Sequence, residues 1–346
     1  MKIFLGILLF VSFVLLFYND NAFGQTGDSI LTVVFIDLGK EGDSTLVIFP
    51  NNNTMLIDGG LKFDESFEKV KSVLEENNVQ RINLMIGTHV DADHIGGLAR
   101  LLAEDSQYYN KVDEIWTNGM PHTSDIYNEF IENIANQDNV QHKIAVAPMP
   151  TNLGDPVLVQ IVSPPQQGIS SHSDHATEQN SNSLVTRMIY GDISFLFTAD
   201  TTWTTEEWLV ENNPDLIDVD IMNAPHHGTK YASGYRETGF IETTSPKLVI
   251  FSANTDNKYG HPHAEAKQRY DDAGIRTLQT GIVGNVVIKT DGERCSLILV
   301  GEPEQPCFDG VKTIPEFPLA VLILLFALMP ILFLTRNRFA NPKLAN

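Results

Sequence analysis

The chain has 346 residues, of which 42% are hydrophobic, so it can bury a full core in one large domain or two small ones. Its formal net charge of −21 excludes the broad basic surface with which proteins usually bind long nucleic acids. Nucleic acid is therefore a partner that the net charge disfavours, although a bound metal could still hold a nucleic-acid substrate.

The two ends of the chain predict membrane targeting. Residues 1–24 combine Lys2 with an apolar run and end at small residues, which predicts a signal peptide, with an uncleaved anchor as the alternative. Residues 318–334 form an apolar run long enough to span a bilayer, and the basic tail at 335–346 should stay on the cytoplasmic side. These ends predict a single-pass C-terminal anchor in the cell membrane, with the domain outside the cytoplasm.

Between the ends, strands and helices are predicted in one domain at 29–300, followed by a Pro-containing stalk at 301–317. The predicted strands are 29–38, 44–49, 54–57, 82–87, 114–117, 156–162, 183–190, 193–198, 219–223, 248–252, 284–290 and 295–300, and the predicted helices are 64–76, 95–103, 124–135, 204–210 and 264–273. Strands in hairpins mixed with strand–helix alternation favour an α/β sandwich. Cys295 and Cys307 could pair in an oxidising compartment, or remain two free thiols.

Four side chains that can bind metal lie within six residues, at the end of an apolar strand: His89, Asp91, Asp93 and His94. An acidic run alone is usually a solvated turn, but two histidines and two aspartates at this spacing can converge on one point. The neighbouring pair 96–97 is Gly-Gly, which lets the backbone approach closely. Imidazole and carboxylate together suit zinc, manganese or iron.

The run at 89–94 resembles the His-x-His-x-Asp-His signature of the metallo-β-lactamase superfamily, with Asp91 in place of the second histidine. An aspartate at this position is characteristic of the hydrolase domain of the competence protein ComEC, which the run therefore resembles. Further segments resemble the same branch, in the same order, at 35–39, 42–44, 56–60, 88–97, 180–185, 195–200, 224–228 and 259–262. The resemblance implies an αββα sandwich with two mixed sheets inside and helices outside. The motif at 314–317, with the apolar run and basic tail after it, resembles the Pro-Glu-Phe-type sorting signals of archaea.

The resemblance also implies a site with two divalent metal ions, zinc first and manganese as the alternative. The implied metal ligands are His89, Asp91, Asp93, His94, Asp200 and His226, and Asp200 would bridge the two ions. Two adjacent histidines point in different directions, so only one of His226 and His227 is expected to face the site, and His226 is favoured. The implied catalytic residues are Asp93, which would orient the nucleophile, and His227 or His261, which could protonate the leaving group. His261 is also a reserve ligand, with a plain loop histidine as the alternative, and Asp58 would orient a ligand from behind.

These expectations describe a metal-dependent hydrolase in which a metal-activated hydroxide attacks a phosphorus or carbonyl centre. A phosphodiesterase or nuclease-like enzyme acting on a small-molecule or phosphodiester substrate is favoured. A lactone, thioester or β-lactam hydrolase is one alternative. A non-catalytic surface-binding protein with a degenerate metal site is the other.

Overall fold

The computed structural model describes residues 29–62, 65–171, 175–311 and 313–314. The predicted signal peptide, C-terminal apolar run and basic tail lie outside these residues. Within the described ranges, no helix has the length and apolar character needed to cross a membrane.

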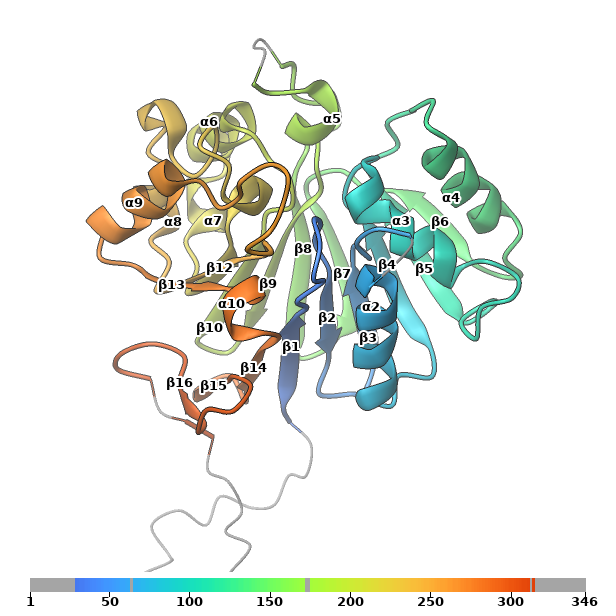
Figure 1. Cartoon of the computed structure of the whole chain (residues 1–346), viewed down its shortest axis with the longest axis horizontal. Helices are drawn as coiled ribbons and strands as arrows, with labels where there is room; N and C mark the ends of the chain where they lie inside the picture. The colour runs from blue at the N-terminus through green and yellow to red at the C-terminus, as the bar shows by residue number, and fades with distance from the viewer. Residues whose placement is uncertain (1–28, 63–64, 172–174, 312, 315–346) are drawn as a thin grey trace, which may run out of the picture.

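Two twisted sheets pack face to face at the centre of the molecule (Figure 1). The first contains, in spatial order, β16 (Gln305–Pro306), β15 (Cys295–Ile298), β14 (Val286–Thr290), β1 (Leu31–Phe35), β2 (Thr45–Ile48), β3 (Thr54–Ile57), β4 (Ile82–Gly87), β5 (Val112–Thr117) and β6 (Gln141–Ile144). The second contains β13 (Arg276–Gln279), β12 (Leu248–Phe251), β11 (Ile221–Asn223), β10 (Ile193–Phe197), β9 (Val185–Tyr190), β8 (Val157–Ser163) and β7 (Met149–Gly154). Both sheets mix parallel and antiparallel pairs, as the resemblance implied.

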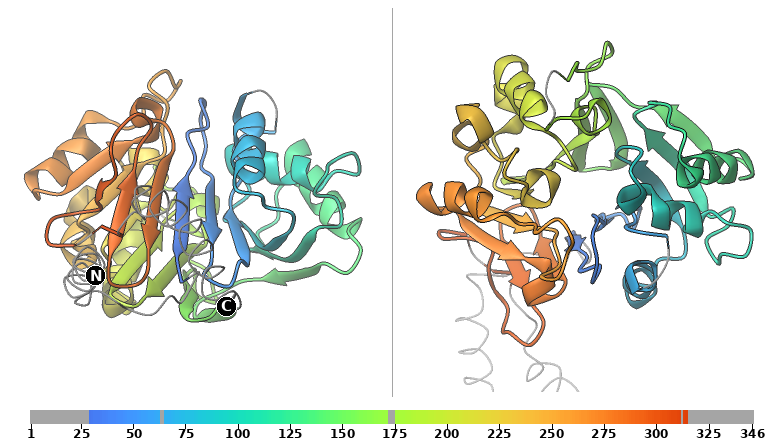
Figure 2. Two further views of the ribbon diagram at one scale, coloured as in Figure 1. Left: turned by 90° about the horizontal axis from the view of Figure 1, so that it is seen from below. Right: turned by 45° about the horizontal axis from the view of Figure 1, so that its top comes forward.

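Helices cover the outer face of each sheet, as the two views of Figure 2 also show. The first sheet is covered by α2 (Glu65–Glu76), α3 (Ala92–Leu101) and α4 (Asp125–Ala135), and the second by α6 (Trp203–Asn212), α7 (Pro214–Ile217), α8 (Phe240–Thr244) and α9 (Ala264–Asp272). Two short helices, α5 (Glu178–Ser181) and α10 (Thr280–Val283), lie in connecting segments.

Three apolar layers hold this arrangement together. Phe35, Trp116 and Phe195 are buried between the two sheets. Phe130 packs in the layer between the first sheet and its helices, and Tyr270 in the layer between the second sheet and its helices. Because most strands are buried on both faces, they are apolar runs, whereas the edge strand β6 is exposed and the edge strand β7 is partly exposed. The predicted αββα sandwich of the metallo-β-lactamase type is therefore confirmed.

The last strand extends the sheet beyond residue 300, where the stalk was expected to begin. Strand β16 pairs with β15, and a disulfide joins Cys295 to Cys307 with the two Cα atoms 5.5 Å apart. Phe308 is buried against the layer between the sheets. The bond and this buried ring hold the segment against the domain, so the predicted pairing of the cysteines is confirmed. Such bonds persist in oxidising compartments.

Candidate metal centre

The site lies where parallel strands end. Strands β3, β4 and β5 are parallel neighbours in the first sheet, and β10, β11 and β12 are parallel neighbours in the second. Loops that follow the carboxyl ends of parallel strands share one edge of a sheet, which is where α/β folds place their ligands. The loops after β4, β10 and β11 bring the predicted histidines and aspartates together.

The loop after β4 carries His89, and helix α3 carries Asp93 and His94. The helix begins at Ala92, whereas the sequence predicted a start at 95, so the last two side chains project from its first turn. Asp91 occupies the N-cap position in an extended conformation, but its side chain makes no capping hydrogen bond. Its carboxylate lies 3.5 Å from His89 Nε2 and is 42% exposed.

The Asp200 carboxylate lies at the centre of the cluster. Its Oδ1 is 3.2 Å from His94 Nε2 and 3.1 Å from His227 Nε2. Its Oδ2 is 3.3 Å from His226 Nε2 and 3.9 Å from His89 Nε2. The two oxygens of one carboxylate therefore face two separate pairs of imidazoles, which is the arrangement that a carboxylate shared by two ions requires.

Two overlapping groups of side chains have ligand atoms close enough to hold a metal ion. His89, His94 and Asp200 form the first, and Asp93, His94 and His227 form the second, with their ligand atoms within 4.8 Å of one another in each group. His227, which the sequence had assigned to orientation or proton transfer, thus joins the candidate ligands.

The expectation that only one of the two adjacent histidines faces the site is wrong. Both His226 and His227 direct Nε2 at Asp200. The cause is the backbone, because both residues have left-handed conformations, with φ of 49° and 54°. Asp58, just after β3, and Ala199, just after β10, also have positive φ. Such conformations cost about 1–3 kcal/mol each and gather at functional sites.

Three of the imidazoles are held through Nδ1, which leaves Nε2 for the cluster. His227 Nδ1 lies 3.0 Å from the Ser252 carbonyl oxygen, to which it must donate. His94 Nδ1 lies 2.7 Å from Asp58 Oδ2. His89 Nδ1 lies 3.1 Å from Thr88 Oγ1. A proton on Nδ1 fixes the tautomer whose Nε2 lone pair is free for a metal.

Asp58 controls two of these three rings. Its Oδ2 accepts from the Thr88 hydroxyl at 2.7 Å, so that hydroxyl has no second proton and its oxygen accepts from His89 Nδ1. The same Oδ2 accepts from His94, and Oδ1 accepts from the Thr88 backbone amide at 2.9 Å. The orienting contacts that the resemblance implied for Asp58 are present.

The side chains fit a divalent metal. Among the described residues, His89 Nε2, His94 Nε2, His227 Nε2 and Asp200 Oδ1 are buried and have no hydrogen-bond partner. Buried polar atoms in folded proteins are almost always satisfied, and four that converge on one region without partners indicate an absent ligand. Imidazole nitrogen with carboxylate oxygen is a donor set for zinc and for related divalent ions.

Electrostatics also favour a cation here. Burial raises the pKa of the Asp200 carboxyl, but the charges of His226, His227 and His94 outweigh it and hold that pKa well below its usual range. Burial lowers the pKa of His94, but the Asp200 and Asp58 carboxylates outweigh it and raise that pKa well above its usual value. The Asp200 carboxylate therefore stays ionised, and a metal cation beside it would replace the proton that His94 Nε2 otherwise carries.

His261 lies at the mouth of the cluster, with its ring centroid 5.8 Å from that of His226 and 6.0 Å from that of His227. It belongs to neither of the two metal-binding groups among the described residues. Burial, followed by the charges of His227 and His226, lowers the pKa of His261 to about 3. The imidazole is then neutral at pH 7, which disfavours the predicted proton donation to a leaving group.

The close approach expected beside the metal-binding run is present. A Cβ atom on Gly97 would lie 1.9 Å from the Gly59 carbonyl oxygen, and one on Gly42 would lie 2.2 Å from the Asp93 carbonyl oxygen. Glycine is thus required where α3 packs against the loops after β1 and β3.

Asp43 was not among the predicted site residues, although it lies in the motif at 42–44. Its carboxylate is buried, and Oδ2 accepts from Asn223 Nδ2 at 2.8 Å. Burial raises the pKa of Asp43, although the charges of His227 and His94 oppose that effect. An aspartate between a glycine and a buried strand was the signal that could have indicated it.

Sequence comparisons match the chain to one family and to two curated relatives. The model of the family described as "Anti-Pycsar protein Apyc1" matches residues 40–233, which is more than half of the chain. ComE operon protein 3 of Bacillus subtilis (strain 168) is 27% identical over 271 residues, which are 73% of this chain and 32% of that protein. Competence protein ComA of Neisseria gonorrhoeae is 28% identical over 107 residues, 31% of this chain and 15% of that protein. The chain thus spans about a third or less of each of these relatives.

Solved structures resemble the chain in fold. The metallo-beta-lactamase fold protein YhfI from Bacillus subtilis is 13% identical, with a TM-score of 0.46, and the match covers 72% of this chain and 95% of YhfI. A diphosphatase of the PhnP family is 15% identical, with a TM-score of 0.41, over 71% of this chain and 94% of the diphosphatase. The match to ComE operon protein 3 confirms the predicted likeness to ComEC. The chain belongs to the family described as "Anti-Pycsar protein Apyc1".

Proposed function

We propose that this chain is a phosphodiesterase whose centre holds two divalent metal ions that share Asp200. The observation that carries the proposal is the position of the Asp200 carboxylate, whose two oxygens face different pairs of imidazoles. His89 would hold the ion on the Oδ2 side, and Asp91 and His226, which belong to neither converging group of the described residues, would complete its ligands. Asp93, His94 and His227 would hold the ion on the Oδ1 side.

The ions, when bound, would lower the pKa of a water and stabilise negative charge on the reacting group. The chain's own part is to position that chemistry. Asp58 and Thr88 fix the rings of His94 and His89, and the Ser252 carbonyl fixes His227. Asp93, 22% exposed and 3.9 Å from His227 Nε2, would orient an attacking water by accepting its hydrogen bond.

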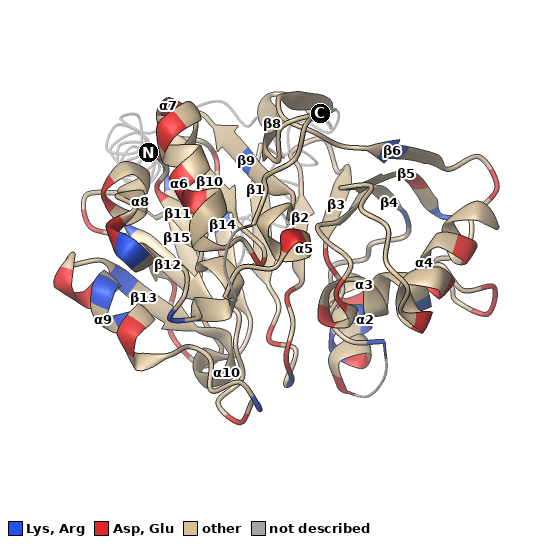
Figure 3. Cartoon of the chain, turned by 90° about the horizontal axis from the view of Figure 1, so that it is seen from above, with Lys and Arg blue, Asp and Glu red and all other residues tan. Residues whose placement is uncertain are grey.

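Charge favours an anionic substrate of small size. Acidic residues are spread over the helices on both sides of the molecule (Figure 3), so the surface repels a long polyanion. At the centre, two divalent ions would balance the carboxylates of Asp58, Asp91, Asp93 and Asp200, while burial raises the pKa of Asp43 and so favours its neutral form. A phosphodiester carries one negative charge and would meet no net repulsion there.

The test is turnover of bis(para-nitrophenyl) phosphate by the metal-loaded chain. Asp93→Ala should lower kcat/KM at least about 100-fold, because it removes a ligand. Asp125→Ala is the matched control, since Asp125 also lies in the first turn of a helix but is exposed. It should leave turnover within twofold.

Three outcomes would contradict the proposal. Wild type could turn over para-nitrophenyl acetate or nitrocefin but not the phosphodiester, which would favour the ester, lactone or β-lactam alternative. It could turn over none of these substrates, which would leave a non-catalytic binding protein. The Asp93→Ala variant could retain full phosphodiester turnover.

A further inference from the structure

The loop between β12 and α9 borders the candidate metal centre and carries an exposed lysine. His261 lies in this loop, and its ring centroid is 5.8 Å from that of His226 and 6.0 Å from that of His227. The Tyr259 ring stacks on His261, with the centroids 5.6 Å apart and an angle of 24° between the rings. Lys258 Nζ in turn lies 4.7 Å from the centroid of the Tyr259 ring. A series of ring contacts therefore leads from the clustered histidines to an ammonium group at the surface.

The side chain of Asn257 holds this loop in shape. Its Nδ2 donates to the Asn254 carbonyl oxygen at 2.7 Å. Its Oδ1 accepts from the backbone amides of Tyr259 at 3.1 Å and His261 at 2.9 Å. Asparagine commonly fixes a turn through such bonds to nearby backbone groups. The loop therefore presents Lys258 and Tyr259 from a backbone that is already ordered.

The charge of Lys258 acts on the entrance to the centre. The side chain is exposed and forms no ion pair with any residue that the structure describes. A hydrogen bond to the Tyr259 side chain raises the pKa of Lys258, and the charges of Glu41 and Asp93 add to that rise. Glu41 lies in the loop after β1, and Asp93 is a candidate metal ligand. The ammonium group is therefore charged at pH 7 and within electrostatic reach of the ligands of the ions.

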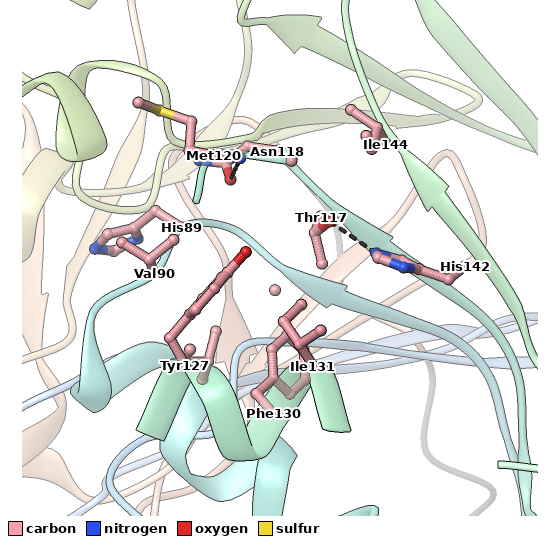
Figure 4. A pocket seen from close by; sticks show the side chains of 13 residues that line it. His89, Val90, Thr117, Asn118, Met120, Tyr127, Phe130, Ile131, His142 and Ile144 are labelled. Carbon is pink, nitrogen blue, oxygen red and sulfur yellow. Dashed lines mark hydrogen bonds between the residues drawn. The ribbon is translucent and has the colours of Figure 1, made fainter. Parts of the chain in front are cut away.

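The opposite side of the centre offers no such charge. Beside His89 lies a cavity of about 230 Å³, shown in Figure 4. Its described lining residues include neither lysine nor arginine. His142 lines it, but burial lowers the pKa of that imidazole, which is therefore neutral at pH 7. An anion that approaches the centre thus meets a positive side chain at the loop with Lys258 and none at the cavity wall.

A cation at the entrance matters because the rest of the chain is acidic. The net charge of −21 repels an anion at a distance. At the centre, the two ions of the proposed function would be balanced by carboxylates. An exposed ammonium group beside that balanced centre would attract an anionic ester and leave a neutral ester of the same size unaffected.

We propose that Lys258 is a substrate-binding residue that recognises the negative charge of the substrate, and that Tyr259 supports its ammonium group. The inference rests on the proposed function, because that function brings a phosphodiester to the cluster. It names the substrate class more closely, since it makes the site selective for anionic esters over neutral ones.

The test is the steady-state kinetics of the metal-loaded full chain with bis(para-nitrophenyl) phosphate. Lys258→Ala should raise KM about fivefold and leave kcat within twofold, because an exposed charge acts on binding rather than on the chemical step. Lys258→Arg keeps the charge and should restore KM to within twofold of wild type. The difference between wild type and Lys258→Ala should shrink at about 1 M salt, which screens exposed charges.

Lys289→Ala is the matched control, since it removes the same charge from another exposed position. Lys289 pairs with Thr32 near the start of β1, whereas the loop that reaches the site follows the other end of that strand. Its KM should stay within twofold of wild type. Calorimetry of inorganic phosphate binding to the metal-loaded chain gives a readout that needs no turnover. The phosphate Kd should rise about fivefold in Lys258→Ala and stay within twofold in Lys289→Ala.

An unchanged KM and an unchanged phosphate Kd in Lys258→Ala would overturn the inference, as would a wild type that binds no phosphate. A rise in KM that Lys258→Arg does not reverse, or that Lys289→Ala shares, would also overturn it. Failure of the proposed function has a different signature. In that case no phosphodiester would be turned over, but phosphate binding would still weaken in Lys258→Ala and not in Lys289→Ala.

Discussion

At the scale of single residues, Asp58 connects the fold to the chemistry. Its carboxylate lies at the end of β3, behind the cluster, and is 1% exposed. It holds His94 directly and His89 through Thr88. Rings fixed in this way present Nε2 without further loss of rotamer freedom, so Asp58 should contribute to metal affinity although it contacts no metal itself.

We expect Asp58→Asn to weaken metal binding about 10–100-fold, because an amide has only one accepting oxygen and its NH2 group must face either the Thr88 backbone amide or the Thr88 hydroxyl and His94 Nδ1, which are all donors. Asparagine tolerates the positive φ of 56° at this position, so the backbone is preserved. Competition with a chelating dye measures the Kd for zinc, and circular dichroism checks the fold. Asp105→Asn, at an exposed position, is the control. A folded Asp58→Asn protein with a wild-type Kd would show that the contacts only support the structure.

At the scale of elements, the sequence indicated which segments carry ligands but not how their backbones turn. The spacing 89–94 predicted a shared loop, whereas two of the four side chains lie on the first turn of α3. The two left-handed residues at 226–227 carry ordinary side chains, and no composition signal marks such a conformation. Their orientation depends on packing between loops that are distant in the sequence, which a single sequence does not show.

Helix α6 carries a buried carboxyl group whose ionisation should make the stability of the folded protein depend on pH. Glu206 is fully buried and accepts hydrogen bonds from the backbone amides of Ser233 and Gly234, and so holds the loop before η2 (Tyr235–Glu237). Burial outweighs these hydrogen bonds and raises the pKa of Glu206 to about 7. The folded state therefore favours the protonated form more than the unfolded state does.

The free energy of unfolding should therefore fall as the pH rises. Stability from this group is fully present below the unfolded pKa of about 4.5 and is lost as the pH rises through the folded pKa of about 7. The loss is about 3 kcal/mol. Glu206→Gln cannot ionise, so its Tm relative to wild type should rise between pH 5 and pH 8.

The exposed neighbour Glu207 provides the control, because Glu207→Gln should show a difference in Tm that stays constant over the same range. Thermal melts at several pH values measure both variants. A Glu206→Gln difference that is flat or falls with pH would contradict the account.

At the scale of the whole molecule, the sandwich could be predicted because most strands are buried on both faces and appear as apolar runs. Strand β6 was missed because all four of its residues are exposed. Strand β7 was missed because Pro150 and Asn152 interrupt it, and a register shift follows within it. Strand β16 has two residues and depends on the disulfide that holds it. The cavity beside His89 could not be predicted, since α4, β5 and β6 meet only in the folded chain.

The most direct measurement of the central claim is the metal content of the purified full chain after reconstitution with zinc or manganese and removal of excess ion. The account predicts two divalent ions per chain in wild type. It predicts fewer than one in Asp200→Ala, because both proposed sites share that carboxylate. No bound ion in wild type, or two ions retained in Asp200→Ala, would contradict it.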